Sequence, residues 1–476
     1  MAEKLRLGVK VRQLRRREGL TQQQLAERLE ISTSYLNLIE NNRRPLSAPL
    51  LIRLAKLFDL DLQAFAGADE KELSPDLMEA FGDPLFDAHS LQSNDVREFA
   101  GASPEIARAV LTLYRAYQSA RHSVDSLAAE ISDGEGMKLI EHSPSEEVSN
   151  FIQSHLNYFP DLEAGAEKLR RDAKLADVDL WEGLVRYLGD AHGIQVRIAK
   201  VGAMRGAVRR FDPQKRVLTL SELLRRGSRN FQLAHQVGLL EYSDTFNKTT
   251  ADAILSADES RALCRVSLAN YFAGAVLMPY DDFLEASRAE RYDIELLSHR
   301  FRCSFEQVCH RLTSLRKKGA EGIPFHLVRV DLAGNISKRF SASGMRFPRF
   351  NAACPLWNVH AAFLTPNMIS VQLERMPDGI TYFSVARTLR KEGGGFHASH
   401  PVQAIAVGCE THYAREMVYS DGIDIDNHDA ADPVGITCRL CERMDCEQRA
   451  FPPVQHPLRI EENVRGLSFY APVEER

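Results

Sequence analysis

The apolar residues of this chain change their spacing along its length. Up to about Arg316 they recur mostly at three- and four-residue intervals, as in helices, whereas in later segments such as "PFHLVRVDLAGNISKRFSAS" they nearly alternate, as in strands. A chain of 476 residues is too long for one compact core. At about 150 residues per domain, the sequence predicts roughly three domains, with an antiparallel sheet toward the C-terminus.

Composition and charge limit the class of protein. Hydrophobic residues make up 44% of the chain and charged residues 26%, which is typical of a globular protein. We find no apolar run of about 18 residues that could span a bilayer, and no signal-peptide cleavage site near the N-terminus. We therefore expect a cytoplasmic protein. The net charge is −5, yet residues 1–44 contain ten Lys/Arg against five Glu, so this segment alone is predicted to bind a polyanion.

The stretch that begins at Thr21 has the pattern of two short helices joined by a tight turn. It is "TQQQLAERLEISTSYLNLIENNRRPLS", in which Thr21 and Ser32 are expected to cap successive helices. Leu25 and Leu29 follow the first cap at helical spacing. Through T-Q-x-x-L-A, I-S, Y-L and I-E, the segment resembles the phage-repressor type of helix-turn-helix. A helical hairpin that contacts only protein is the alternative.

This resemblance implies that the second helix enters the major groove of DNA. The N-terminal half of such a helix needs short polar side chains to reach base edges, and flanking polar and basic residues bind phosphates. Regulators of this type generally act as dimers on palindromic sites, so operator DNA and a homodimer are implied. The candidate residues are Thr33, Ser34 and Asn37 for bases, and Gln22, Arg43 and Arg44 for phosphates.

Residues 67–165 are predicted to be a linker followed by a helical connector. Residues 67–100 are acidic, weakly periodic and interrupted by Pro and Gly, which is typical of a linker. From Ser103 to Ser132, apolar residues return at helical spacing. The resulting stripe, which includes Ile106 and Leu113, is either a dimer interface or ordinary core packing.

The stretch "LAHQVGLLE" is a damaged zinc motif. A helix with His-Glu-x-x-His presents two histidines to zinc and a glutamate that acts as the base. Here His235 is followed by Gln236 in place of the glutamate and by Leu239 in place of the second histidine. With the later box "ANYFAGAVLMP", which begins at Ala269, the region resembles the ImmA/IrrE peptidase domain.

The departures from that family argue against catalysis. An amide cannot act as a general base near neutral pH, and the position of Gln236 therefore lacks the base. The family's acidic third ligand precedes the later box, where Val266, Ser267 and Leu268 offer no carboxylate. We expect a peptidase fold without an enzyme activity, with His235 as a structural histidine.

Three cysteines are bunched near the C-terminus in "GITCRLCERMDCEQRAFPP". These are Cys438, Cys441 and Cys446, and Cys409 at the end of a predicted strand is the candidate fourth thiolate. A tight triplet with one remote cysteine is more typical of a [4Fe-4S] cluster, whereas structural zinc usually takes two separated C-x2-C pairs. Free or redox-active thiols are the third alternative.

A loop at residues 345–363, "MRFPRFNAACPLWNVHAAF", gathers cations and an aromatic ring. Arg346 and Arg349 bracket a proline, and Trp357 and His360 follow. This combination suits a phosphorylated, ring-bearing ligand such as a nucleotide or coenzyme A. A buried structural loop with surface arginines is the alternative.

Taken in order, these segments resemble the short-chain fatty acyl-CoA regulators over nearly the whole chain. The segment "CRLCERMDCEQRAFPP" carries the most specific part of the likeness. These transcription factors govern propionate and acetate assimilation, and their C-terminal domain is taken to sense the acyl-CoA. The resemblance implies propionyl-CoA or acetyl-CoA as the effector. A redox- or iron-sulfur-sensing regulator and a DNA-linked zinc protease are the alternatives.

The predicted fold class is multidomain, with α and α+β parts. The expected domains are an all-α helix-turn-helix head (1–66), a linker and mainly helical connector (67–165), an α+β ImmA/IrrE-like domain (166–320) and an α+β sensor domain with an antiparallel sheet (321–476).

Overall fold

The chain forms two compact units, each with hydrophobic cores of its own. The first consists mainly of Met1–Glu141, and the second of His142–Pro348 and Ala352–Gln448. The computed structural model describes residues 11–58, 68–131 and 144–453, apart from positions 13, 16–17, 19, 41–43, 45–47, 87–90, 92, 176–178, 253, 349–352, 391–397 and 399.

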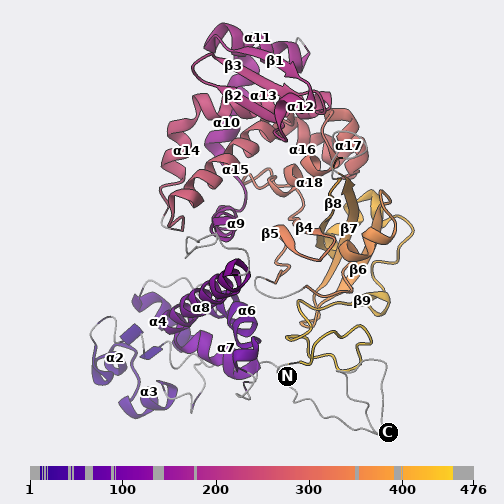
Figure 1. Ribbon diagram of the computed structural model, residues 1–476. Coiled ribbons are helices and arrows are strands. Elements are labelled where there is room, and N and C mark those ends of the chain that lie inside the picture. The colour runs from indigo at the N-terminus through magenta and orange to yellow at the C-terminus, as the bar shows by residue number, and fades with distance from the viewer. Residues whose placement is uncertain are drawn as a thin grey trace. The chain divides into compact units, whose positions relative to one another are not determined.

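The first unit begins with a small helical head (Figure 1). Thr21 caps its helix α2 through a capping box, because its side chain accepts a hydrogen bond from the Gln24 N–H and its own N–H donates to the Gln24 side chain. Leu25, Leu29 and Leu36 are buried between the helices. The predicted helix-turn-helix is confirmed. The helices are α2 (Gln22–Arg28), α3 (Thr33–Glu40) and α4 (Ala48–Phe58).

Helices also occupy most of the stretch for which the sequence predicted a linker. Leu73, Leu77 and Ala80 lie on one face of α6 and pack with Leu111 of α8. The linker prediction is wrong for α6 and α7, because their few apolar residues share α8 as a partner that local periodicity cannot reveal. The elements are α6 (Ala68–Phe81), η1 (Pro84–Phe86), α7 (Ser93–Ala102) and α8 (Pro104–Ile131).

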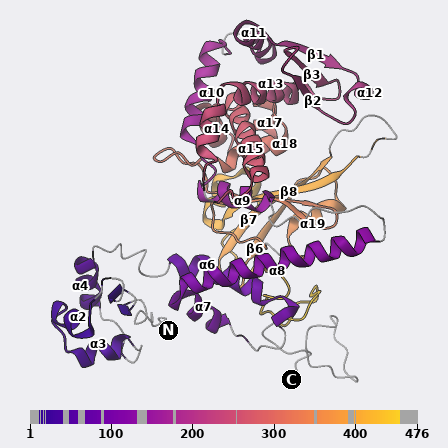
Figure 2. The same cartoon turned by 60° about the vertical axis from the view of Figure 1, so that its left-hand side comes forward.

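Helix α8 is 28 residues long (Figure 2) and divides its apolar residues between two sides. Leu111 and Tyr114 are buried in the core that α8 shares with α6 and α7. Ile106 and Leu113 are 58% and 71% exposed. Part of the predicted stripe is therefore core packing, and a dimer interface on the remainder stays a prediction.

The second unit begins with a helical layer and a small sheet built around α13 and α15. Leu233, Val237 and Phe272 of these helices lie in its core. The sheet has the order β1-β3-β2, with β3 parallel to β1 and antiparallel to β2 (Figure 1). The strands are β1 (Gln195–Ala199), β2 (Arg209–Asp212) and β3 (Val217–Ser221). The helices are α9 (Pro144–Ser154), α10 (Pro160–Asp172), α11 (Leu180–His192), α12 (Val201–Met204), α13 (Arg226–Glu241), α14 (Ser243–Thr249), α15 (Asp258–Leu277), α16 (Tyr280–Ala289), α17 (Ile294–Phe301) and α18 (Phe305–Thr313).

A buried ion pair joins three of these helices. Arg311 on α18 donates to both carboxylate oxygens of Glu163 on α10, at 2.6 and 2.9 Å. Tyr271 of α15 donates its hydroxyl to the same carboxylate. Burial alone would lower the pKa of Arg311, but the Glu163 charge raises it overall. The charges therefore satisfy each other inside the core.

The rest of the second unit is built on a larger sheet of order β5-β4-β8-β7-β6-β9, antiparallel except where β6 meets β9. The predicted multidomain fold with α and α+β parts is confirmed. The strands are β4 (His326–Asp331), β5 (Ile336–Ser341), β6 (Ser370–Arg375), β7 (Thr381–Arg390), β8 (Val402–Glu410) and β9 (Asp432–Pro433). The short helices are α19 (Asn358–Ala361), η2 (Ala362–Leu364), η3 (Thr411–Glu416), η4 (Val418–Ser420) and η5 (His428–Ala430).

The two faces of this sheet belong to different cores. Ile405 and Val407 of β8 join the core of the helical layer. Ala404 and Ala406 join a second core that contains Trp357. This division follows from the alternation of side chains along a strand.

Within the described ranges, no single helix has the length and apolar composition to cross a membrane. Helices α15 and α16 meet that test only as a pair, which is bent by 65°.

Candidate functional site

In the helical head, the candidate base-reading residues lie at the start of α3. Thr33, Ser34 and Asn37 are all exposed. Arg44 is exposed beyond the end of α3, and Arg43 lies outside the described residues. The first turn of α3 therefore presents short polar side chains, as a recognition helix requires.

Gln22 is tied to a buried carboxylate. Its Nε2 donates to Glu40 Oε2 at 2.8 Å, and Arg15 donates to both oxygens of Glu40, at 2.7 and 3.0 Å. Burial would raise the pKa of Glu40, but the hydrogen bonds from Arg15 and Gln22 lower it overall. Glu40 thus joins the start of α2 to the end of α3 and sets their relative positions. The sequence does not predict this role, because Glu40 carries no local signal of burial.

The degenerate zinc motif lies on α13, facing strand β2. His235 and Gln236 are buried, with 3% and 4% exposure, and Leu239 packs against the core. Arg209 of β2 uses one nitrogen, Nη1, to donate to His235 Nδ1 at 2.8 Å and to Gln236 Oε1 at 3.0 Å. Burial and then the Arg209 charge lower the pKa of His235 to about 3, so the imidazole is neutral at pH 7. The sequence motif gives no indication of Arg209.

The structure corrects the cysteine set. Cys409 is fully buried in the helical-layer core, where its Sγ lies 3.7 Å from the Met417 sulfur. On β8 it lies on the same side of the sheet as Ile405 and Val407, so it faces away from the core that contains Cys354. Cys409 as the fourth thiolate is therefore wrong.

Cys354 is a buried cysteine beside the loop that contains Cys438 and Cys441. Its N–H donates to the Ile436 carbonyl at 3.0 Å. Burial raises the pKa of its thiol to about 11, and nearby Cys438 and Cys441 contribute to the rise. Its position within the loop at 345–363, already noted for its arginines, was the one signal that could have found it.

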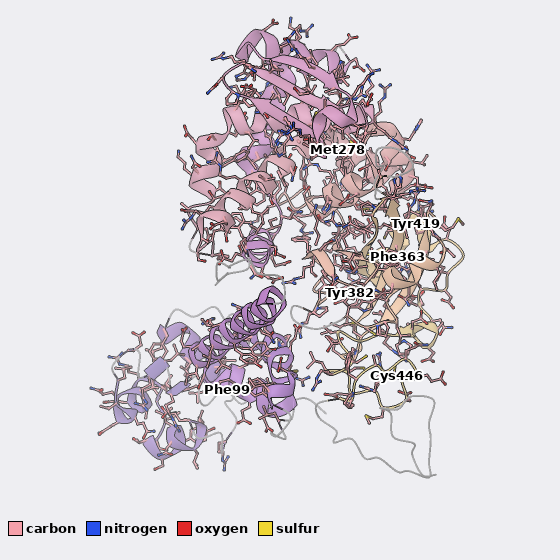
Figure 3. All side chains as sticks on the ribbon, in the orientation of Figure 1. Phe99, Met278, Phe363, Tyr382, Tyr419 and Cys446 are labelled. Carbon is pink, nitrogen blue, oxygen red and sulfur yellow. The ribbon has the colours of Figure 1, made fainter. Side chains whose placement is uncertain are left out.

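The loop that contains Cys438, Cys441 and Cys446, here called the cysteine loop, is held to the edge of the sheet by an arginine. Arg443 donates to the carbonyls of Val434 and Arg375, each at 2.6 Å. Cys446 lies further along this irregular segment (Figure 3). Within the described part of the chain, no three His, Cys, Asp or Glu side chains are arranged closely enough to hold a metal ion.

The loop at 345–363 is partly exposed and partly core. Trp357 is 2% exposed, with Phe347 edge-on at 5.6 Å and the His360 ring stacked at 6.5 Å. The Trp357 Nε1 and His360 Nε2 atoms are buried, and neither has a hydrogen-bond partner among the described residues. Arg346 is exposed, and Arg349 lies outside the described residues. Two buried polar atoms without partners are costly and require an explanation.

Comparison with known proteins assigns each region to a family. Residues 11–65 match a helix-turn-helix domain, residues 190–313 an IrrE N-terminal-like domain, and residues 314–470 the C-terminal domain of short-chain fatty acyl coenzyme A regulators. A propionyl-CoA carboxylase regulator from Cereibacter sphaeroides is 40% identical over 100% of both chains.

This chain belongs to the short-chain fatty acyl coenzyme A regulator family. It is a transcriptional regulator with a helix-turn-helix domain. Other members of the family are the HTH-type transcriptional regulators PrpR and RamB of Mycobacterium tuberculosis. They are 37% and 38% identical to it, and the matches cover 98% of this chain and 96% and 98% of theirs. A solved structure of a Mycobacterium tuberculosis transcriptional regulator matches with a TM-score of 0.67 and 40% identity, covering 70% of this chain and 100% of that one.

Proposed function

We propose that this chain is a homodimeric, operator-binding regulator of short-chain acyl-CoA metabolism and that propionyl-CoA or acetyl-CoA is its effector. The observation that carries the proposal is end-to-end similarity to a propionyl-CoA carboxylase regulator. Exposed polar residues at the start of α3 support the DNA-binding half, with Thr33, Ser34 and Asn37 on bases. Gln22, Arg43 and Arg44 bind phosphates.

The effector binds at the loop that contains Arg346, Arg349, Trp357 and His360. The arginines supply the cations for the phosphates of coenzyme A. The buried, unpartnered nitrogens of Trp357 and His360 support a loop that rearranges around a ligand, because the rearrangement would give both atoms a partner. Since Trp357 is buried, it contacts the effector only after such a rearrangement.

Cys438, Cys441 and Cys446 form a metal site whose fourth ligand is Cys354. The donor set fits a [4Fe-4S] cluster, because three thiols follow one another closely and the fourth is remote in sequence; zinc is the alternative. When bound, such a cluster would crosslink the two loops, because thiolates from both loops would ligate its irons. Cys354 lies three residues before Trp357, and its N–H already bonds to the cysteine loop. Metal and effector therefore act on one connected structure.

The chain is not an enzyme, and it acts in the cytoplasm. Gln236 and Leu239 leave the peptidase-like domain without the base and the second zinc ligand. The domain transmits the effector signal through its shared core with the large sheet.

A thermal-shift panel of CoA thioesters on anaerobically purified protein tests the effector. A preferred ligand stabilises the folded state by mass action, so the melting temperature rises most for one of propionyl-CoA and acetyl-CoA. Operator affinity with and without that thioester then tests the regulation. Equal operator affinity in both conditions would overturn the sensing half of the proposal.

Iron content tests the cysteine set with a matched pair of variants. Cys354→Ser should reduce bound iron, whereas Cys409→Ala should retain it, because Cys409 lies in the opposite core. Loss of iron from Cys409→Ala alone would restore the original set. If the anaerobic preparation is colourless and contains zinc, the bound metal is zinc and not an iron-sulfur cluster.

A second candidate function is a redox- or iron-sensing regulator, which the three bunched cysteines favour. It predicts that operator affinity differs between anaerobic and air-oxidised protein in the absence of any thioester. Unchanged affinity after oxidation would remove this candidate.

A further inference from the structure

The degenerate peptidase site holds a positive charge beside the counterpart of the first zinc ligand. His235 is the counterpart of the first zinc ligand, and the Arg209 guanidinium contacts its Nδ1 at 2.8 Å. The same nitrogen of Arg209 contacts Gln236, which replaces the catalytic base. The cation is therefore positioned by the surviving histidine and by the residue that replaces the base.

Arg209 has no counter-charge in the part of the chain that the structure describes. Its described partners are a neutral imidazole and an amide oxygen, and burial lowers the pKa of its guanidinium. Both bonds use Nη1, so the Nε and Nη2 donors make no hydrogen bond to a described residue. A half-buried cation without an anion is unfavourable, which indicates a role other than stability.

The chain segment that contains Arg209 is rich in basic residues. Residues 195–229 contain ten Lys/Arg but only two Asp/Glu. Such an excess creates a positive potential that raises the local concentration of anionic ligands. Arg210 next to Arg209 is exposed and bonds instead to the Met204 carbonyl. Arg210 therefore contributes to the positive charge of the surface, whereas Arg209 is held beside His235 and Gln236.

We propose that Arg209 is the positive centre of this site and that the site binds a small oxyanion, either a carboxylate or a phosphate, at the Nε and Nη2 edge of its guanidinium. A guanidinium fork matches two oxygens of such an anion with parallel hydrogen bonds. The chemistry differs from hydrolysis, because the anion is bound without an activated water. This binding function lies outside the effector loop and does not depend on the identity of the acyl-CoA.

Calorimetric titration of the full chain with sodium acetate and, separately, with inorganic phosphate tests the proposal. Ionic strength is held constant with chloride, and no DNA or CoA is present, so the result is independent of the effector proposal. Wild type should bind one of the two anions saturably, and the arm that responds identifies the class. Arg209→Met should weaken that binding by about ten- to a hundredfold, as expected for a charge-assisted hydrogen bond.

Arg210→Met is the matched control, because it removes the same charge from the adjacent position. It should change affinity by less than about threefold, since surface charges contribute little individually. Arg209→Lys keeps the charge but loses the fork, and it should give intermediate affinity even if the methionine variant folds poorly. Absence of saturable binding to wild type, equal binding by Arg209→Met, or equal losses in both methionine variants would overturn the proposal.

Discussion

Two arginines of the peptidase-like domain are withdrawn from water, and only one has a counter-charge among the described residues. Arg311 is buried and bonds to both oxygens of Glu163. Arg209 is half-buried and bonds to a neutral histidine and an amide. The first arrangement is complete and connects three helices. The second retains donors that bond to no described residue. The comparison therefore separates an arginine kept for stability from an arginine available to a ligand.

The largest expected effect comes from breaking the complete pair. Glu163→Gln keeps the size of the side chain but leaves the Arg311 charge buried and unpaired. We expect the free energy of unfolding to fall by about 3–5 kcal/mol. Denaturant unfolding followed by circular dichroism measures this loss. A loss below about 1 kcal/mol would mean that the two arginines do not differ as described.

Acid sensitivity is the next largest effect. The pKa of His235 is about 3 in the folded chain, whereas an unfolded histidine titrates near its ordinary value of about 6.5. Between these values the unfolded chain binds the extra proton, so the stability due to neutral His235 is complete above about pH 6.5 and is lost progressively as the pH falls toward 3. The loss is about 2 kcal/mol at pH 5.

The matched variant for that prediction is His235→Gln, which cannot be protonated. As the pH falls from 7 to 5, the free energy of unfolding of this variant should rise relative to that of wild type. Parallel stability curves over this range would show that His235 is not held neutral beside Arg209.

A smaller loss of stability should follow removal of the Tyr271 hydroxyl from the buried Arg311–Glu163 pair. Tyr271→Phe deletes the hydrogen bond to Glu163 but leaves both bonds from Arg311. We expect a loss of about 1–2 kcal/mol in unfolding free energy. Additivity with Glu163→Gln in a double-mutant cycle would contradict a shared network.

The smallest effect should come from Arg209. Arg209→Met removes an uncompensated charge, which is favourable, but leaves His235 Nδ1 and Gln236 Oε1 without their donor, which is unfavourable. The two contributions oppose each other, so unfolding free energy should change by less than about 1 kcal/mol. Destabilisation as large as that of Glu163→Gln would place Arg209 with the structural arginines.

Patterns confined to a short segment were predictable. The caps and apolar spacing around Thr21 indicated the helix-turn-helix, because capping and helical spacing act over a few residues. The alternation beyond Arg316 indicated an antiparallel sheet for the same reason. Helices α6 and α7 were missed, since their apolar residues depend on α8 for burial.

The candidate sites divide in the same way. His235 and Gln236 indicated the altered zinc motif. Arg209 lies 26 residues before His235 and contacts both residues only because β2 lies against α13. The choice of Cys409 was wrong because a cysteine on a strand can face either side of the sheet. Cys354 approaches the other thiols only after the loop before α19 has packed against Ile436.

The sequence by itself determined the family, the order of domains with local signatures and the absence of a catalytic base beside His235. Those properties follow from residue identity and from spacing along one helix or strand. Only the tertiary structure decided which cysteine lies with the C-terminal triplet, which arginine has a counter-charge and which face of α8 is covered. The physical reason is that charge compensation and burial depend on distances between segments, and local sequence patterns do not specify those distances.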